Sequence, residues 1–162
     1  MNIRLTDLET GLKKFLFFYL VTAAIGIGVG LVFLGLSSDF SLSGSVEHIG
    51  GSETQGSFDI PEHYPKSAAD LLVTTHNHIM GFAFLILSVG TIFYFNSTIT
   101  GFWKYFIMIE PLISSIVTFG SLWLVRFVYP EFIWIALLSS VMLYLFLFIM
   151  IGTCIYELRL KN

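Results

Sequence analysis

Four long apolar blocks divide the chain. They cover about residues 12–36, 71–95, 105–128 and 132–156. Each is longer than the roughly 20 residues that an α-helix needs to cross the hydrocarbon core of a bilayer. One longer polar segment and two short turns separate them. The pattern therefore predicts an all-α integral membrane protein, a four-transmembrane-helix bundle with up-down-up-down topology.

The composition agrees with this interpretation, since 56% of the 162 residues are hydrophobic and only 12% are charged. The mean hydropathy of +0.84 is too high for an ordinary soluble domain. Little chain remains outside the spans, so we expect residues 1–162 to form a single membrane domain without a separate catalytic domain. The net charge of -3 comes without a basic patch, which argues against nucleic acid as a partner.

The basic residues give the orientation, because Lys and Arg are enriched on the cytoplasmic side of membrane proteins. One side of the four-span pattern holds most of them, namely Arg4, Lys13, Lys14, Lys104, Arg159 and Lys161. The other side holds Lys66 and Arg126. Both termini are therefore expected in the cytoplasm. The first block lacks a small-residue cleavage site and is interpreted as a retained span of a multi-pass protein in the cell membrane, with the bacterial inner membrane favoured.

An external loop, about residues 37–69, joins the first two spans. It is acidic, since its charged residues are Asp39, Glu47, Glu53, Asp59, Glu62 and Lys66. The segment shows no clear periodicity, while Pro61 and Pro65 favour an extended, ordered approach to the second span. Its charge would suit the docking of a cationic periplasmic electron carrier.

Two smaller features complete the pattern. Thr6 and Glu9 have the spacing of a capping box, which predicts a helix start at the membrane surface. Cys154 is the only cysteine of the sequence, so no disulfide is expected within the chain. We interpret it as a small buried hydrophobic residue.

The sequence Thr74-Thr75-His76-Asn77-His78 places five polar side chains in succession inside an otherwise apolar span. Ionisable groups at such positions are costly and mark functional sites. His76 and His78 are about 200° apart on a regular helix, so both cannot chelate one small ion unless the helix breaks. We therefore expect the two histidines to have separate roles, near the outer face of the membrane.

The face of His78 also carries Gly81 and Ser88. Small residues beside a histidine let a flat porphyrin approach a helix closely, so the pattern indicates heme b. Either His76 or His78 would be the axial ligand, because the sequence does not choose between them. The alternatives are a metal ion on His76 or His78, or no cofactor, with the cluster serving as interhelical hydrogen bonds.

A second axial ligand is not evident, because the other three spans contain no histidine. Met142 in the fourth span, at comparable depth, is one candidate. His63 or His48 could reach over from the external loop. A ligand from a second subunit is the remaining possibility.

Arg126 stands at the outer end of the third span, where positive charge is normally scarce. A guanidinium at this depth could grip the propionates of a heme held at His76 or His78. Alternatively, Arg126 snorkels towards the surface and pairs with Glu131 or Asp70.

The third span also contains Glu110, directly before Pro111, about two turns from its inner end. Ser114, Thr118 and Ser121 follow on one face of the helix. This polar stripe is a candidate proton path. The alternative is a proline-kinked helix whose freed backbone groups are satisfied by neighbouring hydroxyls.

Three functions remain open. The first is a heme-binding, b-type cytochrome-like electron-transfer subunit, the second a non-catalytic accessory or assembly subunit of a larger membrane complex, and the third proton or metal-ion transport by an oligomer. No hydrolase triad, phosphate loop or nucleotide fingerprint occurs, so we do not expect the chain to be an enzyme alone, although it suits a subunit of a membrane oxidoreductase. Besides the lipid bilayer, the expected partners are other membrane subunits or further copies of the chain.

Overall fold

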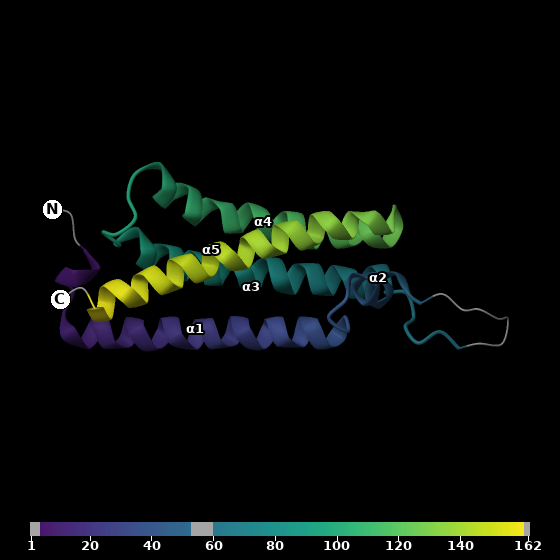
Figure 1. Cartoon of the computed structure of the whole chain (residues 1–162), viewed down its shortest axis with the longest axis horizontal. Coiled ribbons are helices and arrows are strands. Elements are labelled where there is room, and N and C mark those ends of the chain that lie inside the picture. The colour runs from purple at the N-terminus through teal and green to yellow at the C-terminus, as the bar shows by residue number, and fades with distance from the viewer. Residues whose placement is uncertain (1–3, 53–59, 161–162) are drawn as a thin grey trace.

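A computed structural model describes residues 4–52 and 60–160 of the chain. Within these residues the protein is helical and contains no β-strand. Figure 1 shows a long bundle with α2 at one end. The helices in chain order are η1 (Leu5–Asp7), α1 (Thr10–Ser37), α2 (Leu42–Gly50), α3 (Ala68–Tyr94), α4 (Phe102–Phe127), η2 (Pro130–Phe132) and α5 (Ile133–Leu160), where η marks a short 3-10 helix.

The apolar blocks of the sequence form α1, α3, α4 and α5, the four helices of the described part that are long and apolar enough to cross a membrane. The shortest has 26 residues, which is about 39 Å at 1.5 Å per residue and exceeds a hydrocarbon core of roughly 30 Å. Consecutive spans run in opposite directions, so α1 begins where α5 ends (Figure 1). The predicted fold class is therefore confirmed. The location of that end in the cytoplasm stays a prediction from the Lys and Arg pattern. The end with both termini is called the inner end, and the end with α2 is called the outer end, as names only.

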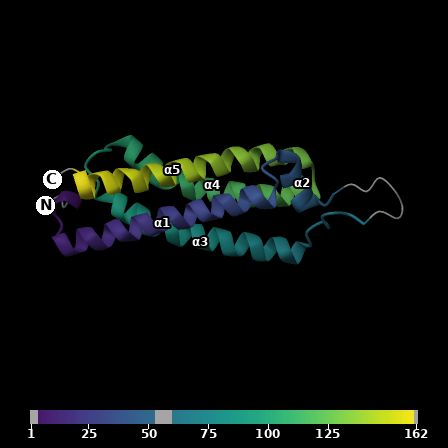
Figure 2. The ribbon, with the colours of Figure 1, turned by 60° about the horizontal axis from the view of Figure 1, so that its bottom comes forward.

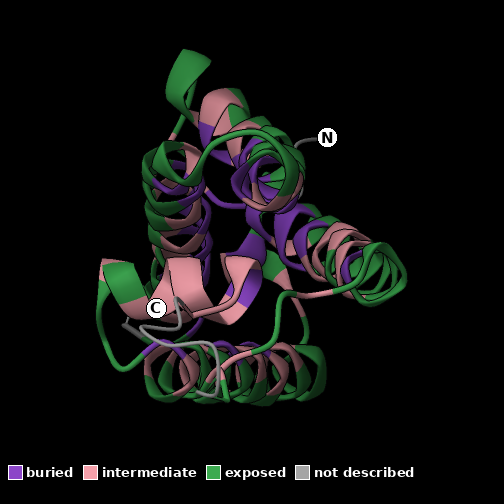
Figure 3. Cartoon of the chain, turned by 90° about the vertical axis from the view of Figure 1, so that its right-hand side faces the viewer, coloured by how far each residue is buried: buried purple, intermediate pink, exposed green. Residues whose placement is uncertain are grey.

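The three spans α3, α4 and α5 pack against one another, and α1, at the front in Figure 2, packs mainly on α5. On α1 only Leu20 and Ile27 are buried among the described residues. Figure 3 shows buried positions where the helices face one another and exposed positions around the perimeter. Since the exposed side chains of the spans are mostly apolar, this perimeter suits contact with lipid or with other membrane helices.

Two hydrophobic clusters hold the bundle together. The larger cluster follows α5, whose Leu143, Leu147 and Met150 are fully buried against the inner halves of the other spans. The smaller cluster lies at the outer end and joins Ile49 of α2 to residues of the central spans such as Leu71. Burial of Ile49 there fixes α2 on top of the bundle, so the beginning of the external loop is part of the core.

The helix α2 is a correction to the sequence analysis, which expected only a loop between the first two spans. Ser41 caps it, because the Ser41 hydroxyl accepts a hydrogen bond from the Gly44 N–H at 2.8 Å. The helix ends at Gly51, whose φ of 91° is in the region that favours glycine. With nine residues, α2 is too short for a reliable periodic pattern, and its burial depends on contact with the spans.

The residues at the end of α2 and directly after it form hydrogen bonds with the segment that leads into α3. The Ser52 N–H donates to the His63 carbonyl at 3.0 Å, and the Lys66 N–H donates to the Ile49 carbonyl at 3.1 Å. The His63 N–H in turn donates to the Ser52 hydroxyl at 2.7 Å. The approach to α3 is therefore ordered. Two acidic residues of the predicted loop, Glu53 and Asp59, lie outside the described residues.

The beginning of the chain also differs from the prediction. The helix expected from the Thr6 and Glu9 spacing is replaced by η1, where the Arg4 N–H donates to the Asp7 carboxylate at 3.1 Å, and α1 begins only at Thr10. Leu5 is fully buried, and its N–H donates to the Phe95 carbonyl at 3.1 Å. This long-range contact favours a single tight turn over a longer surface helix.

Candidate functional site

The ring of His78 lies against α4, with its centroid 4.7 Å from the centroid of the Phe119 ring. Nδ1 of His78 lies 2.8 Å from the carbonyl oxygen of Thr74, one turn earlier on α3. Because a carbonyl oxygen only accepts hydrogen bonds, Nδ1 is the donor in this contact. Nε2 is then the nitrogen left for a ligand, an arrangement typical of histidines that bind a metal through Nε2.

His76 is placed separately. The helix α3 is regular through both histidines, so their side chains leave it in different directions, as the spacing predicts. His76 is exposed, and its side chain has no hydrogen bond within the described part of the chain. The structure therefore does not bring the two imidazoles together to hold one ion.

Thr75 connects the histidine cluster to α4. Its hydroxyl accepts a hydrogen bond from the indole Nε1 of Trp123 at 2.9 Å. The sequence does not reveal this contact, because Thr75 and Trp123 are 48 residues apart and lie on different spans. The ring contact between His78 and Phe119 lies one helical turn deeper. Together the two contacts fix the rotation of α3 about its own axis relative to α4.

The surface next to His78 is open. Gly81 is exposed, and a Cβ placed on it would meet no neighbouring heavy atom of the described structure within 4 Å, apart from the backbone of its own helix. Phe82 closes the core side, since its ring lies 5.9 Å from the rings of both Phe119 and Tyr144. A flat ligand could thus approach α3 from outside the bundle at Gly81, and aromatic side chains would form the wall behind it.

Arg126 lies on α4, seven residues beyond Phe119, which is about 10 Å further towards the outer end. Its Nε donates to the Lys66 carbonyl at 2.9 Å, and its guanidinium carbon lies 5.0 Å from the centre of the Phe127 ring. Among the described residues it forms no ion pair with Glu131 or Asp70, which the sequence analysis considered as partners. Its terminal nitrogens are available to another anion.

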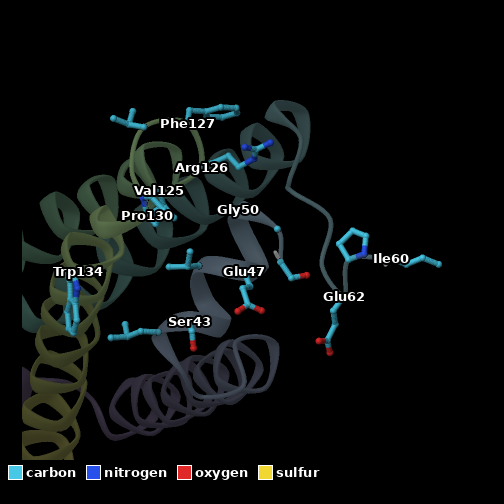
Figure 4. Close-up of a pocket in the computed structure, with 16 residues that line it drawn as sticks. Ser43, Glu47, Gly50, Ile60, Glu62, Val125, Arg126, Phe127, Pro130 and Trp134 are labelled. Atoms are coloured by element: carbon cyan, nitrogen blue, oxygen red, sulfur yellow. The ribbon is translucent and has the colours of Figure 1, made fainter. Parts of the chain in front are cut away.

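A cavity of about 1000 Å³ opens between α2, the segment around Ile60 and the outer end of α4 (Figure 4). Arg126 lines it together with the carboxylates of Glu47 and Glu62 (Figure 4). His76, His78 and Gly81 do not belong to its lining. The outer cavity and the histidine face are therefore separate features, and Arg126 belongs to the outer cavity.

Met142 lies on α5, partly buried against the larger hydrophobic cluster. The Thr118 hydroxyl donates to the Ser139 hydroxyl at 2.8 Å, which places Ser139 near the depth of Phe119 and His78. Met142 is three residues further along α5, so it lies roughly 4–5 Å deeper. No described interaction joins it to a histidine, and its role as an axial ligand stays a prediction.

The two loop histidines lie close to each other, with ring centroids 6.0 Å apart. Partial burial lowers the pKa of His48, and the nearby Lys66 and His63 lower it further. His63 is held by its backbone bonds to Ser52. Among the described residues no contact joins either ring to His76 or His78, so a role of the loop histidines as axial ligands stays a prediction.

The polar stripe of α4 faces the inside of the bundle. Ser114, Thr118 and Ser121 are all buried, and the Ser114 hydroxyl donates to the Glu110 carboxylate. The Ser121 hydroxyl donates instead to the Val117 carbonyl of its own helix. The second carboxylate oxygen of Glu110 is buried without a partner among the described residues. The stripe thus consists of separate local pairs, and a proton path through it stays a prediction.

Glu157, which the sequence analysis did not single out, is almost completely buried at the inner end of α5. Its carboxylate accepts hydrogen bonds from the Ser97 backbone N–H at 2.9 and 3.0 Å and from the Ser97 hydroxyl. Nearby, the Lys104 ammonium donates to the Asn96 carbonyl at 2.7 Å. The sequence signal for this residue is a glutamate among the apolar residues of the fourth span. Its contacts join α5 to the turn between α3 and α4.

The described residues contain no group of three or more His, Cys, Asp and Glu side chains that could hold a metal ion. The four long apolar helices make the chain a multi-pass integral membrane protein, and one of them, α3, carries the histidine face.

Residues 39–162 match the Aq_1264_TM family, a transmembrane helical domain, and the chain belongs to this family. The match includes α2, α3, α4, α5 and every histidine of the chain. No curated protein and no solved structure matches the chain significantly.

Proposed function

We propose that the protein is a membrane-embedded, heme-binding electron-transfer subunit of the b-type cytochrome kind, with His78 as an axial ligand. It would work within a larger membrane oxidoreductase rather than as an enzyme alone. Bound heme b would supply reversible one-electron transfer, and the residues of the chain would hold it in an apolar environment.

The observation that supports this proposal best is the fixed orientation of the His78 ring. The Thr74 carbonyl holds Nδ1 at 2.8 Å, and Phe119 supports one side of the ring. Nε2 is left without a hydrogen bond from the described residues, on a helix whose next turn carries the open Gly81 surface. An axial histidine needs a free ring nitrogen to bind the heme iron. It also needs space beside it for the porphyrin, and Gly81, which has no side chain, leaves such space.

Arg126 is suited to the propionates of the same heme. Its Nε bond to the Lys66 carbonyl fixes the guanidinium at the junction of α4 and the segment before α3. The terminal nitrogens are free to bind a carboxylate in a two-point manner. This role requires that the propionates point towards the outer end of the bundle.

The acidic segment between α1 and α3, called the outer segment, supports the choice of a cationic electron carrier as the redox partner. Glu47 and Glu62 line the outer cavity without forming ion pairs in the described part of the chain. Unpaired carboxylates attract positively charged partners over long range. With the termini in the cytoplasm of a bacterial cell, this face would lie in the periplasm.

The test is the reduced-minus-oxidised visible spectrum of the detergent-purified protein, with heme and metal analysis of the same sample. We expect the absorption bands of a b-type cytochrome and loss of heme in His78→Ala. His76→Ala is the matched control, because it removes an imidazole two residues away that lacks the Thr74 and Phe119 contacts. It should keep its heme.

Heme retained in the double variant His76→Ala/His78→Ala would contradict the proposal. Loss in His76→Ala alone would exclude His78 as the ligand. Purified protein with neither heme nor metal, after expression with heme supplied, would also contradict the proposal and favour an accessory or assembly subunit.

A further inference from the structure

The outer cavity combines charged and apolar walls (Figure 4). Its charged side chains among the described residues are Arg126, Glu47 and Glu62, which give one positive and two negative charges. Phe127 and Trp134 add apolar surface to the lining, and both are more than half exposed. The volume of about 1000 Å³ is at the upper end of the range of roughly 300–1000 Å³ that is typical of small-ligand sites. The cavity is thus suited to a molecule with both charged and apolar parts.

The cavity lies where the spans leave the bilayer. Arg126 is the last residue but one of α4, and Trp134 is the second residue of α5. These helices have 26 and 28 residues, which is more than the roughly 20 that cross the hydrocarbon core, so their ends reach the headgroup region. Tryptophan is enriched at this level. The molecules that face the cavity from the membrane are therefore the headgroups of phospholipids.

The guanidinium of Arg126 is prepared for a phosphate. Its Nε donates to the Lys66 carbonyl at 2.9 Å, and its carbon lies 5.0 Å from the centre of the Phe127 ring, so the side chain is held from two sides. It has no ion pair within the described part of the chain. The terminal nitrogens of a planar guanidinium bind a phosphate through two parallel hydrogen bonds.

Glu47 and Glu62 suit an ammonium group. Neither carboxylate has an ion pair or a hydrogen bond within the described residues. A ligand with a phosphate alone would meet two carboxylates of its own sign, whereas a ligand with a phosphate and an ammonium finds an opposite charge for each group. A primary ammonium donates three hydrogen bonds, while a quaternary ammonium has no N–H to donate. The lining thus favours phosphoethanolamine over phosphocholine or phosphoglycerol.

We propose that the outer cavity binds the phosphoethanolamine headgroup of a membrane phospholipid, with the phosphate on Arg126 and the ammonium at Glu47 and Glu62. The acyl chains would follow the exposed apolar surface that begins at Phe127 and Trp134. The inference goes beyond the proposed function, because it involves no histidine. A headgroup phosphate and a heme propionate would compete for the same nitrogens of Arg126, so the test also uses Glu47, which has no part in the heme proposal.

The experiment is native mass spectrometry of the full-length protein in a mild detergent. Synthetic phosphatidylethanolamine, phosphatidylcholine and phosphatidylglycerol with identical acyl chains are added separately. We expect one phosphatidylethanolamine per chain, bound at least several-fold more tightly than the other two lipids. Arg126→Gln should weaken this binding by roughly tenfold or more. Arg159→Gln is the matched control, because Arg159 also lies over a phenylalanine ring, 5.4 Å from the centre of Phe17, but at the inner end.

Glu47→Gln tests the contact with the ammonium at nearly constant shape. It should reduce the preference for phosphatidylethanolamine at least several-fold, while the heme content of the same sample does not change. Glu131→Gln is the control, since Glu131 is exposed near the same end but does not line the cavity. Arg126→Lys keeps the charge without the planar guanidinium, so it should bind more weakly than the wild type and keep the ethanolamine preference. Thermal midpoints like that of the wild type establish that the variants fold.

Three results would overturn the inference. Equal binding of the three lipids, or equal loss in Arg126→Gln and Arg159→Gln, would exclude recognition of the headgroup by this cavity. An unchanged lipid preference in Glu47→Gln would exclude the contact with the ammonium. Binding of free phosphoethanolamine without retention of the lipid would exclude a phospholipid as the source of the headgroup. None of these results depends on heme at His78, so the two proposals fail separately.

Discussion

The imidazole of His78 and the ring of Phe119 lie 4.7 Å apart between centroids, at 32° between their planes. This contact comes from adjacent antiparallel spans that are 41 residues apart in the sequence. It holds the ring whose Nδ1 is bound to the Thr74 carbonyl. The positioning of His78 thus depends on α4 as well as on α3.

If His78 holds a heme as proposed, replacing Phe119 should weaken heme binding without removing a ligand. Phe119→Leu keeps an apolar side chain but loses the ring contact, which is typically about 0.5 to 1.5 kcal/mol, or roughly two- to tenfold in affinity. Heme titration of the apoprotein measures the effect. Phe33→Leu, at an exposed position of α1, is the control and should bind as the wild type does. Unchanged affinity in Phe119→Leu would show that the contact does not position His78.

The Thr75 and Trp123 hydrogen bond should contribute to the packing of α3 on α4. We expect a coupling of about 0.6 to 1.7 kcal/mol in a double-mutant cycle of Thr75→Val and Trp123→Phe, because membrane hydrogen bonds have about this strength. Reversible unfolding in mixed micelles measures the free energies. Thr91→Val removes a hydroxyl that bonds only to the Leu87 carbonyl of its own helix, and it should show no coupling to Trp123.

Gly51 should not tolerate a side chain. Its φ is 91°, and a Cβ would lie 2.7 Å from the Pro65 ring, so Gly51→Ala should open the pairing between the two arms of the outer segment. A residue held in such a strained conformation costs about 1–3 kcal/mol. Hydrogen exchange of the Ser52 and Lys66 amides measures the opening. Gly50→Ala is a close control, since its Cβ would meet no atom of the described structure within 4 Å.

The outer segment should loosen in acid. The pKa of His48 is lowered from its ordinary value of 6.5, first by burial and then by Lys66 and His63. The unfolded segment therefore binds more protons, and stability is lost as the pH falls below about 6.5, down to the lowered pKa of the folded state. Hydrogen exchange of α2, corrected for intrinsic rates, should become faster between pH 7.5 and 5. In His48→Gln this acceleration should be reduced, and an identical pH profile would rule out His48 as the cause.

Removing the buried carboxylate of Glu157 should destabilise the inner end of the bundle. Glu157→Ala removes the carboxylate that accepts from the Ser97 backbone N–H at 2.9 and 3.0 Å, and the loss of a hydrogen bond costs about 0.5–1.5 kcal/mol. Thermal denaturation in detergent should show a lower midpoint. Glu131→Ala, at an exposed position, should leave the midpoint unchanged.

The candidate site was only partly accessible from sequence. The polar cluster around His76 and His78 was visible because ionisable residues in an apolar span are rare. Which histidine has a fixed ring depends on Phe119, and which threonine is bonded depends on Trp123. Arg126 was visible as an outer cation, but its link to the Lys66 carbonyl depends on how the outer segment folds back.

The membrane class, the four long helices and their alternating direction can all be predicted from the amino-acid sequence. Lengths of apolar sequence and short turns suffice for this, because the bilayer imposes helix length and each helix satisfies its own backbone hydrogen bonds. The rotation of α3 relative to α4, the burial of Glu157 and the position of α2 become visible only in the tertiary structure. These depend on contacts between residues far apart in the chain, and no local periodicity records such contacts.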